Sequence, residues 1–484
     1  MARSRIASGA ALLAVLASCT LTRTKVDDCS SNTDCRNAFG IGFVCGGDGL
    51  CERATVNPRC TRTFPEDLLT RPESYPKAIV YGSLVVGSID SQKARENATR
   101  LALTQANEQQ GLDGRLFGVV FCDLAEDPKY DSLKRTDAVL STGRYLADVI
   151  GAPAFIGPSA SPDVLAVFDE VKASDVLVIS PSATSPELTT HDIVPTATDE
   201  RPGLLWRTAV PDTLQGGVIA RHLKTLSVKN VAIVFEKGAY GEGLERVFRA
   251  AFEQDGGTAQ SFPFAAGISG ERDQRIVEAG ATTASYVLFF SSQSGDQSAF
   301  VTAVAGLDSY NKPAGAEKKL FLSDTAANQD LLKNTTSATA IYPRIIGSRP
   351  AVPSGTAYDL FKTSYSGTFK QDPNQFTFVP HAYDATWLVM YGSAFSLRRE
   401  TKVTGSGIAR GLRRIGRGGE EVLVGPGSWA RVRDDVSSDR PVNLTGASGP
   451  LDFDTATEET TGAIEIWKIS ADGSKIDFVQ KYDP

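Results

Sequence analysis

Short apolar runs alternate with stretches of helical length along most of this chain, and this alternation limits its fold more than any other feature. Residues 92–109 and 131–150 have the apolar spacing of helices, and a further helix is expected to begin near Pro162. Apolar runs without polar alternation are typical of strands buried on both faces of a parallel sheet. The pattern therefore predicts an α/β fold with doubly wound parallel sheets. The first four such runs are residues 79–81, 117–122, 154–157 and 176–179.

A second series of apolar runs follows later in the chain, again with helical stretches between most of them. It comprises residues 231–235, 286–290, 320–322 and 345–346. The chain from residue 76 to residue 484 is too long for one doubly wound sheet, because domains of this class rarely exceed about 250 residues. We therefore predict two α/β lobes.

The composition excludes several classes of protein. With 50 Lys and Arg against 57 Asp and Glu, the net charge is −7, so no nucleic-acid partner is predicted. The three histidines, His191, His222 and His381, are far apart in the sequence, which argues against a histidine-built metal site. No apolar stretch reaches the roughly 18 residues needed to cross a bilayer. A globular exported or surface-tethered protein is the remaining class.

The sequence also lacks the common enzyme motifs. It has no G-x-S-x-G elbow, no H-E-x-x-H and no phosphate-binding G-x-x-x-x-G-K-[ST] loop. The basic run 410–417 is interpreted as the solvated face of a short helix, because Leu412 and Ile415 have helical spacing. We therefore predict a protein that is not an enzyme and holds no cofactor.

The N-terminus has the features of an export signal. Arg3 and Arg5 precede an apolar run at residues 6–17, and small residues follow. The sequence Leu-Ala-Ser-Cys that ends at Cys19 resembles the lipobox of bacterial lipoproteins, which implies a signal peptide at residues 1–18 and a lipid anchor on Cys19. A plain signal peptide with a coincidental cysteine is the alternative. The expected location is periplasmic or on the cell surface, and Thr20 in place of Asp favours the outer membrane.

Six cysteines remain in the exported chain, and an even number in an oxidising compartment predicts three disulfides with fifteen possible pairings. Four of them lie in a glycine-rich part of residues 19–62, which is too small for its own apolar core and would need covalent links. A zinc knuckle is the alternative, but the closely spaced C-x2-4-C pairs that it would use are absent, so no metal is predicted. The six are Cys29, Cys35, Cys45, Cys51, Cys60 and Cys122.

Cys60 and Cys122 form a candidate pair, because the other four cysteines are clustered. Cys60 lies just before a predicted linker at residues 63–75, and Cys122 ends an early strand of the first lobe. A bridge would fasten the linker to that lobe. A buried free thiol at Cys122 is the alternative.

Two polar segments follow neighbouring buried strands, where open α/β sheets bind ligands. In residues 157–163, Ser161 suits the N-cap of a helix and Pro162 its first position, and the N–H groups of a helix start can bind an anion. An ordinary capped helix is the alternative. Residues 179–188 are rich in hydroxyls and prolines. Because both segments end neighbouring strands, a joint polar site is expected at this sheet edge.

The segment ISPSATSPELT at residues 179–189 resembles the signature of the type 1 periplasmic binding proteins, in their branched-chain amino acid (leucine-binding protein) group. The resemblance extends from about residue 76 along nearly the whole chain. WRTAVPDTLQG at 206–216 resembles the crossover between lobes, and FEKGAYGEGL at 235–244 the strand and helix start beyond it. HAYDATWLVM at 381–390 is similar to a first-lobe helix, and GPLDFD at 449–454 to the closing segment.

This resemblance implies two lobes on a three-strand hinge that closes around a small solute. Lobe 1 would comprise residues 76–207 and 335–445, and lobe 2 residues 208–334 and 446–484. An extracytoplasmic solute-binding lipoprotein that feeds an ABC-type permease is the function implied. An envelope sensor or regulatory lipoprotein that contacts a partner protein is the alternative, favoured by the Cys-rich segment.

The resemblance also implies roles for individual residues. Ser161 and Thr184 would hold the carboxylate of an amino-acid-like ligand, and the carbonyl of Ser182 would accept from its ammonium. Tyr240 would reach the ligand from the second lobe, and Asp324 would pair with the ammonium. A packing role for Tyr240 and a surface position for Asp324 are the alternatives.

Two departures from the family pattern concern the side chain of the ligand. Gln293 stands where the family often has an aromatic residue, and the loop at residues 82–90 also lacks one. The sequence therefore predicts a ligand more polar than leucine, such as a polar amino acid, an amide or a small carboxylate.

Overall fold

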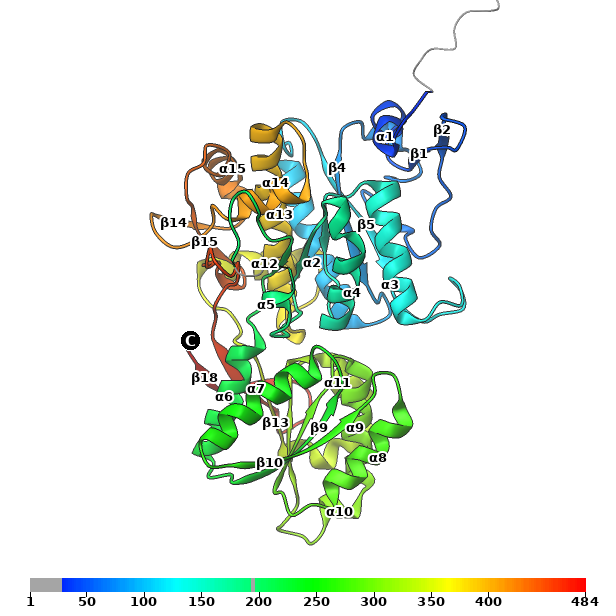
Figure 1. Cartoon of the computed structure of the whole chain (residues 1–484). Helices are drawn as coiled ribbons and strands as arrows, with labels where there is room; N and C mark the ends of the chain where they lie inside the picture. The colour runs from blue at the N-terminus through cyan, green and yellow to red at the C-terminus, as the bar shows by residue number, and fades with distance from the viewer. Residues whose placement is uncertain (1–27, 193–195) are drawn as a thin grey trace, which may run out of the picture.

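The apolar runs of the sequence form the strands of two sheets, one in each of two α/β lobes (Figure 1). This computed structural model describes residues 28–192 and 196–484. The predicted signal peptide and Cys19 lie outside the described residues. In the described part of the chain, none of the helices is both long and apolar enough to cross a membrane.

Lobe 1 contains a six-stranded sheet in the order β3-β5-β4-β6-β7-β8. All its pairs are parallel except that of β3 with β5. Every residue of β4 to β7 is buried, which explains why these segments read as unbroken apolar runs. The strands are β3 Arg62–Phe64, β4 Ile79–Val85, β5 Phe117–Asp123, β6 Ala154–Ile156, β7 Leu177–Ser180 and β8 Leu205–Arg207.

Lobe 2 contains a seven-stranded sheet in the order β10-β9-β11-β12-β13-β17-β18. Its first five strands are parallel, and the last two pair antiparallel at one edge. The strands are β9 Asn230–Glu236, β10 Thr258–Phe264, β11 Tyr286–Phe290, β12 Lys319–Leu322, β13 Ile345–Pro350, β17 Ile464–Ile469 and β18 Ile476–Tyr482.

Helices cover both faces of each sheet, as the doubly wound arrangement requires (Figure 1). Those of lobe 1 are α2 Asp90–Glu108, α3 Arg135–Arg144, α4 Ser161–Val171, α5 Leu188–His191, α12 Thr356–Phe369, α13 Val379–Glu400, α14 Gly405–Leu412 and α15 Trp429–Ser437. Those of lobe 2 are α6 Asp212–Thr225, α7 Gly241–Gln254, α8 Ser269–Gly280, α9 Ser294–Gly306, α10 Asp308–Asn311 and α11 Gln329–Asn334.

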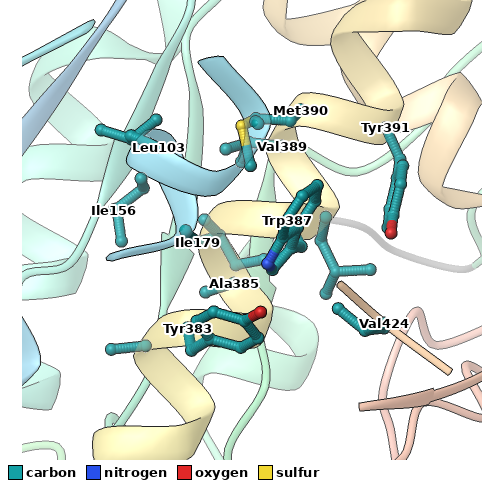
Figure 2. Packing of buried hydrophobic residues seen from close by; sticks show 14 of the residues in the cluster. Leu103, Ile156, Ile179, Tyr383, Ala385, Trp387, Val389, Met390, Tyr391 and Val424 are labelled. Atoms are coloured by element: carbon teal, nitrogen blue, oxygen red, sulfur yellow. The ribbon is translucent and has the colours of Figure 1, made fainter. Parts of the chain in front are cut away.

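Helix α13 is the centre of the lobe 1 core. Its residues from Val379 to Ser396 are all buried, because α2, α14 and α15 pack around it. Trp387 and Tyr391 of this helix form an aromatic group with Trp429 of α15, with ring centroids 5.6–5.9 Å apart. Figure 2 shows Trp387 and Tyr391 on α13 near Val424, which belongs to the segment after β14 (Glu421–Leu423).

The lobe boundaries differ from those predicted. Strand β13 is part of the lobe 2 sheet, so lobe 2 continues to residue 350 and not only to 334. Leu451 and Phe453 belong to the lobe 1 core, so lobe 1 extends beyond residue 445. The predicted linker at 63–75 also begins inside lobe 1, because Arg62–Phe64 pairs with β5. Local apolarity marks a buried strand but does not indicate which sheet it joins.

Three connections join the lobes, at residues 208–211, 351–355 and 454–463, as the three-strand hinge requires. Ion pairs formed by buried arginines lie beside two of them. The Arg207 guanidinium, 1 % exposed, binds both carboxylate oxygens of Glu459 at 2.6 Å. On lobe 2, Arg349 Nε donates to Glu465 at 2.7 Å.

The Cys-rich segment forms a small unit at the end of lobe 1 away from lobe 2 (Figure 1). It consists of α1 (Asn32–Phe39) and the hairpin of β1 (Phe43–Cys45) with β2 (Cys51–Arg53). Two disulfides hold it together, Cys29–Cys45 and Cys35–Cys51. Arg36 docks the unit by donating to the carbonyl of Asp148 at 2.7 Å.

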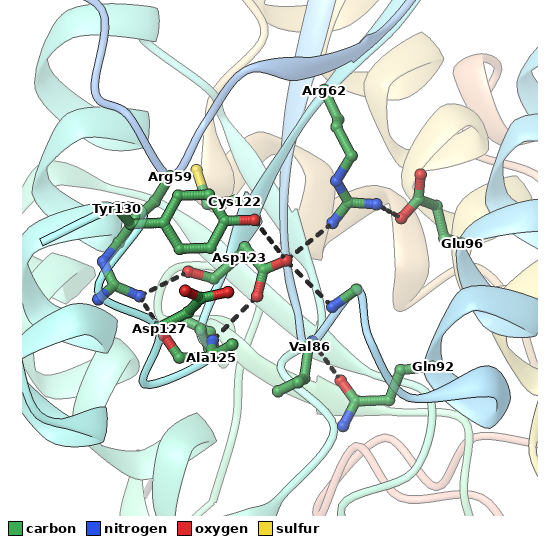
Figure 3. Close-up of polar contacts among 12 residues, drawn as sticks. Arg59, Arg62, Val86, Gln92, Glu96, Cys122, Asp123, Ala125, Asp127 and Tyr130 are labelled. Atoms are coloured by element: carbon green, nitrogen blue, oxygen red, sulfur yellow. Dashed lines mark hydrogen bonds and ion pairs between the residues drawn. The ribbon is translucent and has the colours of Figure 1, made fainter.

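The segment that enters lobe 1 is fastened to the end of β5. A third disulfide joins Cys60 to Cys122, the pair predicted from the sequence. The Arg59 guanidinium donates to the carbonyls of Asp123 and Ala125 at 3.0 and 2.8 Å (Figure 3). Figure 3 also shows the Asp123 carboxylate between Tyr130, at 3.0 Å, and Arg62, at 3.8 Å.

The Cys60–Cys122 bridge should stabilise lobe 1 by limiting the freedom of its unfolded chain. Cys60→Ala with Cys122→Ala is expected to lower the free energy of unfolding by about 2–4 kcal/mol in urea denaturation. Cys29→Ala with Cys45→Ala is the control, because it removes a bridge within the Cys-rich unit only. Equal effects of both pairs on the unfolding of lobe 1 would contradict this assignment.

Candidate functional site

A pocket of about 50 Å³ lies between the lobes, where the carboxyl ends of their parallel strands meet. This is the place at which open α/β sheets bind ligands. Both lobes contribute polar residues to its wall, so a small solute bound there would contact both lobes. The lobe 1 residues in its wall include Ser91, Arg95, Ser159, Ser161, Ser182 and Phe378, and those of lobe 2 include Tyr240, Ser292, Gln293, Asp324 and Asn328.

Ser161 lies in the pocket wall as the first residue of α4, and it is 1 % exposed. It was expected to cap the helix, but Ala160 is the N-cap residue and makes no side-chain cap. The Ser161 hydroxyl instead accepts a hydrogen bond from the N–H of Ser185 at 3.3 Å. It therefore ties the helix start to the loop after β7, and its own proton remains available to a partner.

Ser182 also lies in the wall, next to Ser159. Its hydroxyl donates to the Ser159 carbonyl at 3.1 Å. The Arg95 guanidinium approaches the same place, with Nη1 donating to the hydroxyls of Ser159 at 2.8 Å and Ser182 at 3.3 Å. The carbonyl of Ser182 is predicted to accept a hydrogen bond from a ligand ammonium. The structure instead has the positive charge of Arg95 beside Ser182, and this charge favours an anionic group of a ligand there.

Thr184 does not line the pocket, in contrast to its predicted role. It is fully buried, and its carbonyl accepts a hydrogen bond from the N–H of Asp212 at 2.8 Å. The loop after β7 turns Ser182 toward the pocket and carries Thr184 on to the junction with α6. The motif therefore supplies one pocket residue here and one that supports the lobe connection.

Tyr240 and Asp324 bring lobe 2 into the site from the ends of β9 and β12. Both are nearly fully buried, and the Tyr240 hydroxyl donates to Asp324 Oδ1. Gln215 Nε2 donates to the same oxygen at 3.2 Å. Tyr240 thus positions the Asp324 carboxylate in the pocket wall.

Asp324 lies near a second buried carboxyl group, that of Asp212. Burial raises the pKa of Asp324, and burial together with the nearby Asp324 charge raises the pKa of Asp212 well above its usual value. Two such groups resist ionising together. A ligand ammonium beside Asp324 would favour its charged form and would be bound by it.

Gln293 lies in the pocket wall as the N-cap residue of α9, and it is half-buried. The loop before it is fixed by Glu236 at the end of β9, which accepts hydrogen bonds from both the N–H and the hydroxyl of Ser292 at 2.8 Å. This wall is polar, in agreement with the prediction of a ligand more polar than leucine. An aromatic ring does reach the pocket from Phe378, just before α13, which no sequence motif indicated.

Arg95 is the main site residue that sequence reasoning missed. It lies on α2 with Ser91 and Thr99 one turn to either side, and all three are buried. Burial lowers the pKa of Arg95 to about 10, so the guanidinium stays charged at neutral pH. A polar row at spacing i, i+4 within an alanine-rich helix was the signal that could have found it.

Lobe 2 also contacts lobe 1 directly around the pocket. Helix α2 has no capping side chain of its own, and Asp330 of α11 accepts the hydrogen bond from the Ser91 N–H at 3.0 Å. Next to it, the Thr377 N–H donates to Asn328 Oδ1 at 2.8 Å. The interlobe contacts thus involve two residues of the pocket wall, Ser91 and Asn328, and Asp330 caps a helix of the opposite lobe.

Two lobes whose strand ends meet at a buried polar pocket define a ligand-binding protein of the type 1 periplasmic binding protein fold. Residues 94–472 match the family described as "Receptor family ligand binding region", and the chain belongs to this family. The relatives and solved structures that match this chain are ligand-binding proteins rather than enzymes, in agreement with the sequence prediction.

Curated relatives match parts of the chain. The Leu/Ile/Val-binding protein BraC3 of Rhizobium johnstonii is 30 % identical over 162 residues, 33 % of this chain and 39 % of the relative. The Leucine-specific-binding protein of Salmonella typhimurium is 32 % identical over 179 residues, 37 % of this chain and 43 % of the relative. The matches thus span about two fifths of the length of these relatives.

Solved structures share the fold over a larger part of the chain. The substrate binding protein LivJ of Streptococcus pneumoniae, in complex with isoleucine, has a TM-score of 0.62 at 18 % identity and covers 84 % of this chain and 100 % of its own. A solute binding protein of R. palustris, in complex with 4-hydroxybenzoate, has a TM-score of 0.60 at 17 % identity, covering 84 % and 97 %. At such identities the likeness establishes the fold.

Loss of the Asp330 carboxylate should loosen the contact between the lobes. A charged helix cap is worth roughly 0.5–2 kcal/mol, so Asp330→Ala should speed amide exchange at Ser91 by about 2- to 30-fold. Hydrogen-exchange mass spectrometry of peptides from the start of α2 measures this. Asp308→Ala, at an acid that is 77 % exposed in lobe 2, is the control. Unchanged exchange at Ser91 would show that Asp330 does not hold the lobes.

Proposed function

We propose that this protein is an extracytoplasmic solute-binding protein that closes two lobes around a small amino-acid-like ligand and delivers it to an ABC-type permease. The observation that supports this most is that one pocket is lined by the buried residues Ser161 of lobe 1 and Asp324 of lobe 2. A zwitterion needs an anion site and a fixed acid on opposite sides. Family membership and the isoleucine found in LivJ agree with a ligand of this kind.

Each lobe supplies part of the binding site in this proposal. The start of α4, with Ser161, binds the carboxylate end of the ligand. From lobe 2, Asp324 binds the ammonium, and Tyr240 holds Asp324 in place through its hydrogen bond. Gln293 faces the ligand side chain and acts in specificity.

Export and lipidation complete the proposal. The lipobox-like sequence at Cys19 supports an anchor on the outer face of a membrane, and three disulfides agree with an oxidising compartment.

A sensor or regulatory lipoprotein remains a second candidate, because the Cys-rich unit lies at the end of lobe 1 away from lobe 2, where a partner protein could reach it (Figure 1). Loss of ligand uptake on deletion of the gene favours transport, whereas unchanged uptake favours the second candidate.

The Asp324 carboxylate should contribute most of the affinity for the ammonium. Loss of a charged partner in a desolvated site costs about 2–5 kcal/mol, so Asp324→Asn should weaken binding by roughly 30-fold to several-thousandfold. Gln293→Ala should have a smaller effect on affinity and a larger one on which ligand is preferred. Calorimetry on the best amino acid from a thermal-shift screen measures both. Equal binding by Asp324→Asn and wild type would exclude an ammonium at Asp324.

Lipidation can be tested separately from ligand binding. Cys19→Ala should release the protein from the membrane fraction or block its processing, because the thiol that carries the lipid is lost. Thr20→Ala is the control, since it keeps the lipid-bearing cysteine and should remain in the membrane fraction. Unchanged fractionation and mass of Cys19→Ala would refute the lipid anchor.

A further inference from the structure

Four arginines are buried in the described part of the chain, and Arg95 differs from the other three. Arg59 pairs with Asp131, Arg207 with Glu459 and Arg349 with Glu465. Across residues 28–192 and 196–484, no carboxylate oxygen lies within 4.0 Å of the Arg95 guanidinium. Of these four arginines, Arg95 is therefore the one that forms no ion pair, and it is also the one that lines the pocket.

The partners that Arg95 does have are neutral. Its Nη1 donates to two serine hydroxyls, and its Nε donates to the Thr377 carbonyl at 3.4 Å. The guanidinium also lies over the Phe378 ring, 5.6 Å from its centroid. These contacts fix its position. The carboxylates of Asp330 and Asp324 act on its charge from lobe 2, but neither is close enough to form an ion pair with it. A buried cation without a carboxylate in direct contact is costly, so this arrangement favours an anion in the pocket.

Arg135 is the other arginine that lines the pocket, and it does not offer the same free charge. It pairs with Asp163 of α4 at 2.6 Å. The fixed charge that awaits a partner in the pocket is therefore that of Arg95.

We propose that Arg95 binds a second anionic group of the ligand, so that the preferred ligand is an amino acid with a carboxylate in its side chain. This rests on the function proposed above, in which the start of α4 holds one carboxylate and Asp324 the ammonium. A neutral zwitterion satisfies those two anchors and leaves Arg95 unmatched. An acidic amino acid satisfies all three, and the polar wall at Ser292 and Gln293 agrees with a charged side chain.

Calorimetry on the purified full-length protein tests this with pairs of ligands that differ only in charge. L-glutamate and L-aspartate are compared with L-glutamine and L-asparagine, and L-leucine is the apolar reference. A charged partner in a desolvated site predicts that the acid of each pair binds at least about 30-fold more tightly than its amide.

Arg95→Met should remove that preference, and Arg95→Lys should keep part of it, because Lys retains the charge without the two-pronged donor geometry. Arg417→Lys, at an arginine of lobe 1 whose side chain is 75 % exposed and which does not line the pocket, is the control and should preserve the preference for the acid. Circular dichroism establishes that each variant is folded. If Arg95→Met does not fold, the wild-type ligand pairs still test the preference for the acid, and Arg95→Lys still tests whether Arg95 causes it.

The possible results separate the two proposals. Tight binding of glutamine or leucine with no gain for the acids would overturn the role of Arg95 and leave the solute-binding function standing. Binding of none of the five amino acids would overturn both the acidic ligand and the amino-acid-like ligand of the proposed function. An acid preference that survives in folded Arg95→Met would assign the second anion site to another residue.

Discussion

The geometry of the site depends on the ion pair between the buried Arg207 and the half-buried Glu459 at the junction of the lobes. Arg207 ends the last strand of the lobe 1 sheet, and Glu459 lies in the segment that returns to lobe 2. The same guanidinium donates to the Ser185 carbonyl at 2.8 Å and so fixes the loop that carries Ser182. Removal of one partner of such a pair costs about 3–5 kcal/mol, because the other charge is left buried alone. One side chain thus couples the path of the hinge to the wall of the pocket.

The charges of the pocket follow from which strand ends meet there. Lobe 1 contributes helix starts, serine hydroxyls and Arg95, all of which attract an anion, whereas lobe 2 contributes the carboxyl group of Asp324. Each wall alone is a half-site, since the two ends of an amino acid need opposite partners. Binding therefore requires both lobes, and the interlobe hydrogen bonds of Asp330 and Asn328 form in the same arrangement. Under the proposed function, ligand binding and lobe closure would be coupled through this set of contacts.

Much of the fold could be predicted because buried parallel strands have an unmistakable local pattern. The runs at 79–81, 117–122 and 176–179 all became strands of lobe 1. The lobe assignment of β13 could not be predicted, because nothing local distinguishes a buried strand of one sheet from that of the other. In the site, Ser161, Ser182, Tyr240, Gln293 and Asp324 line the pocket, whereas Thr184, which the same motif predicted to contact the ligand, does not. Arg95 and Phe378 were missed, because their roles depend on how α2 and the start of α13 pack, which the sequence motifs do not encode.

The central claim is that a small solute draws the two lobes together. Small-angle X-ray scattering of the purified protein, with and without a saturating amino acid whose binding calorimetry has established, tests it most directly. The account predicts a smaller radius of gyration in the bound state, with a shift of the whole population as the ligand approaches saturation. An unchanged radius in ligand-free and saturated samples would contradict closure, and the pocket between the lobes would then have to bind its ligand without any movement of the hinge.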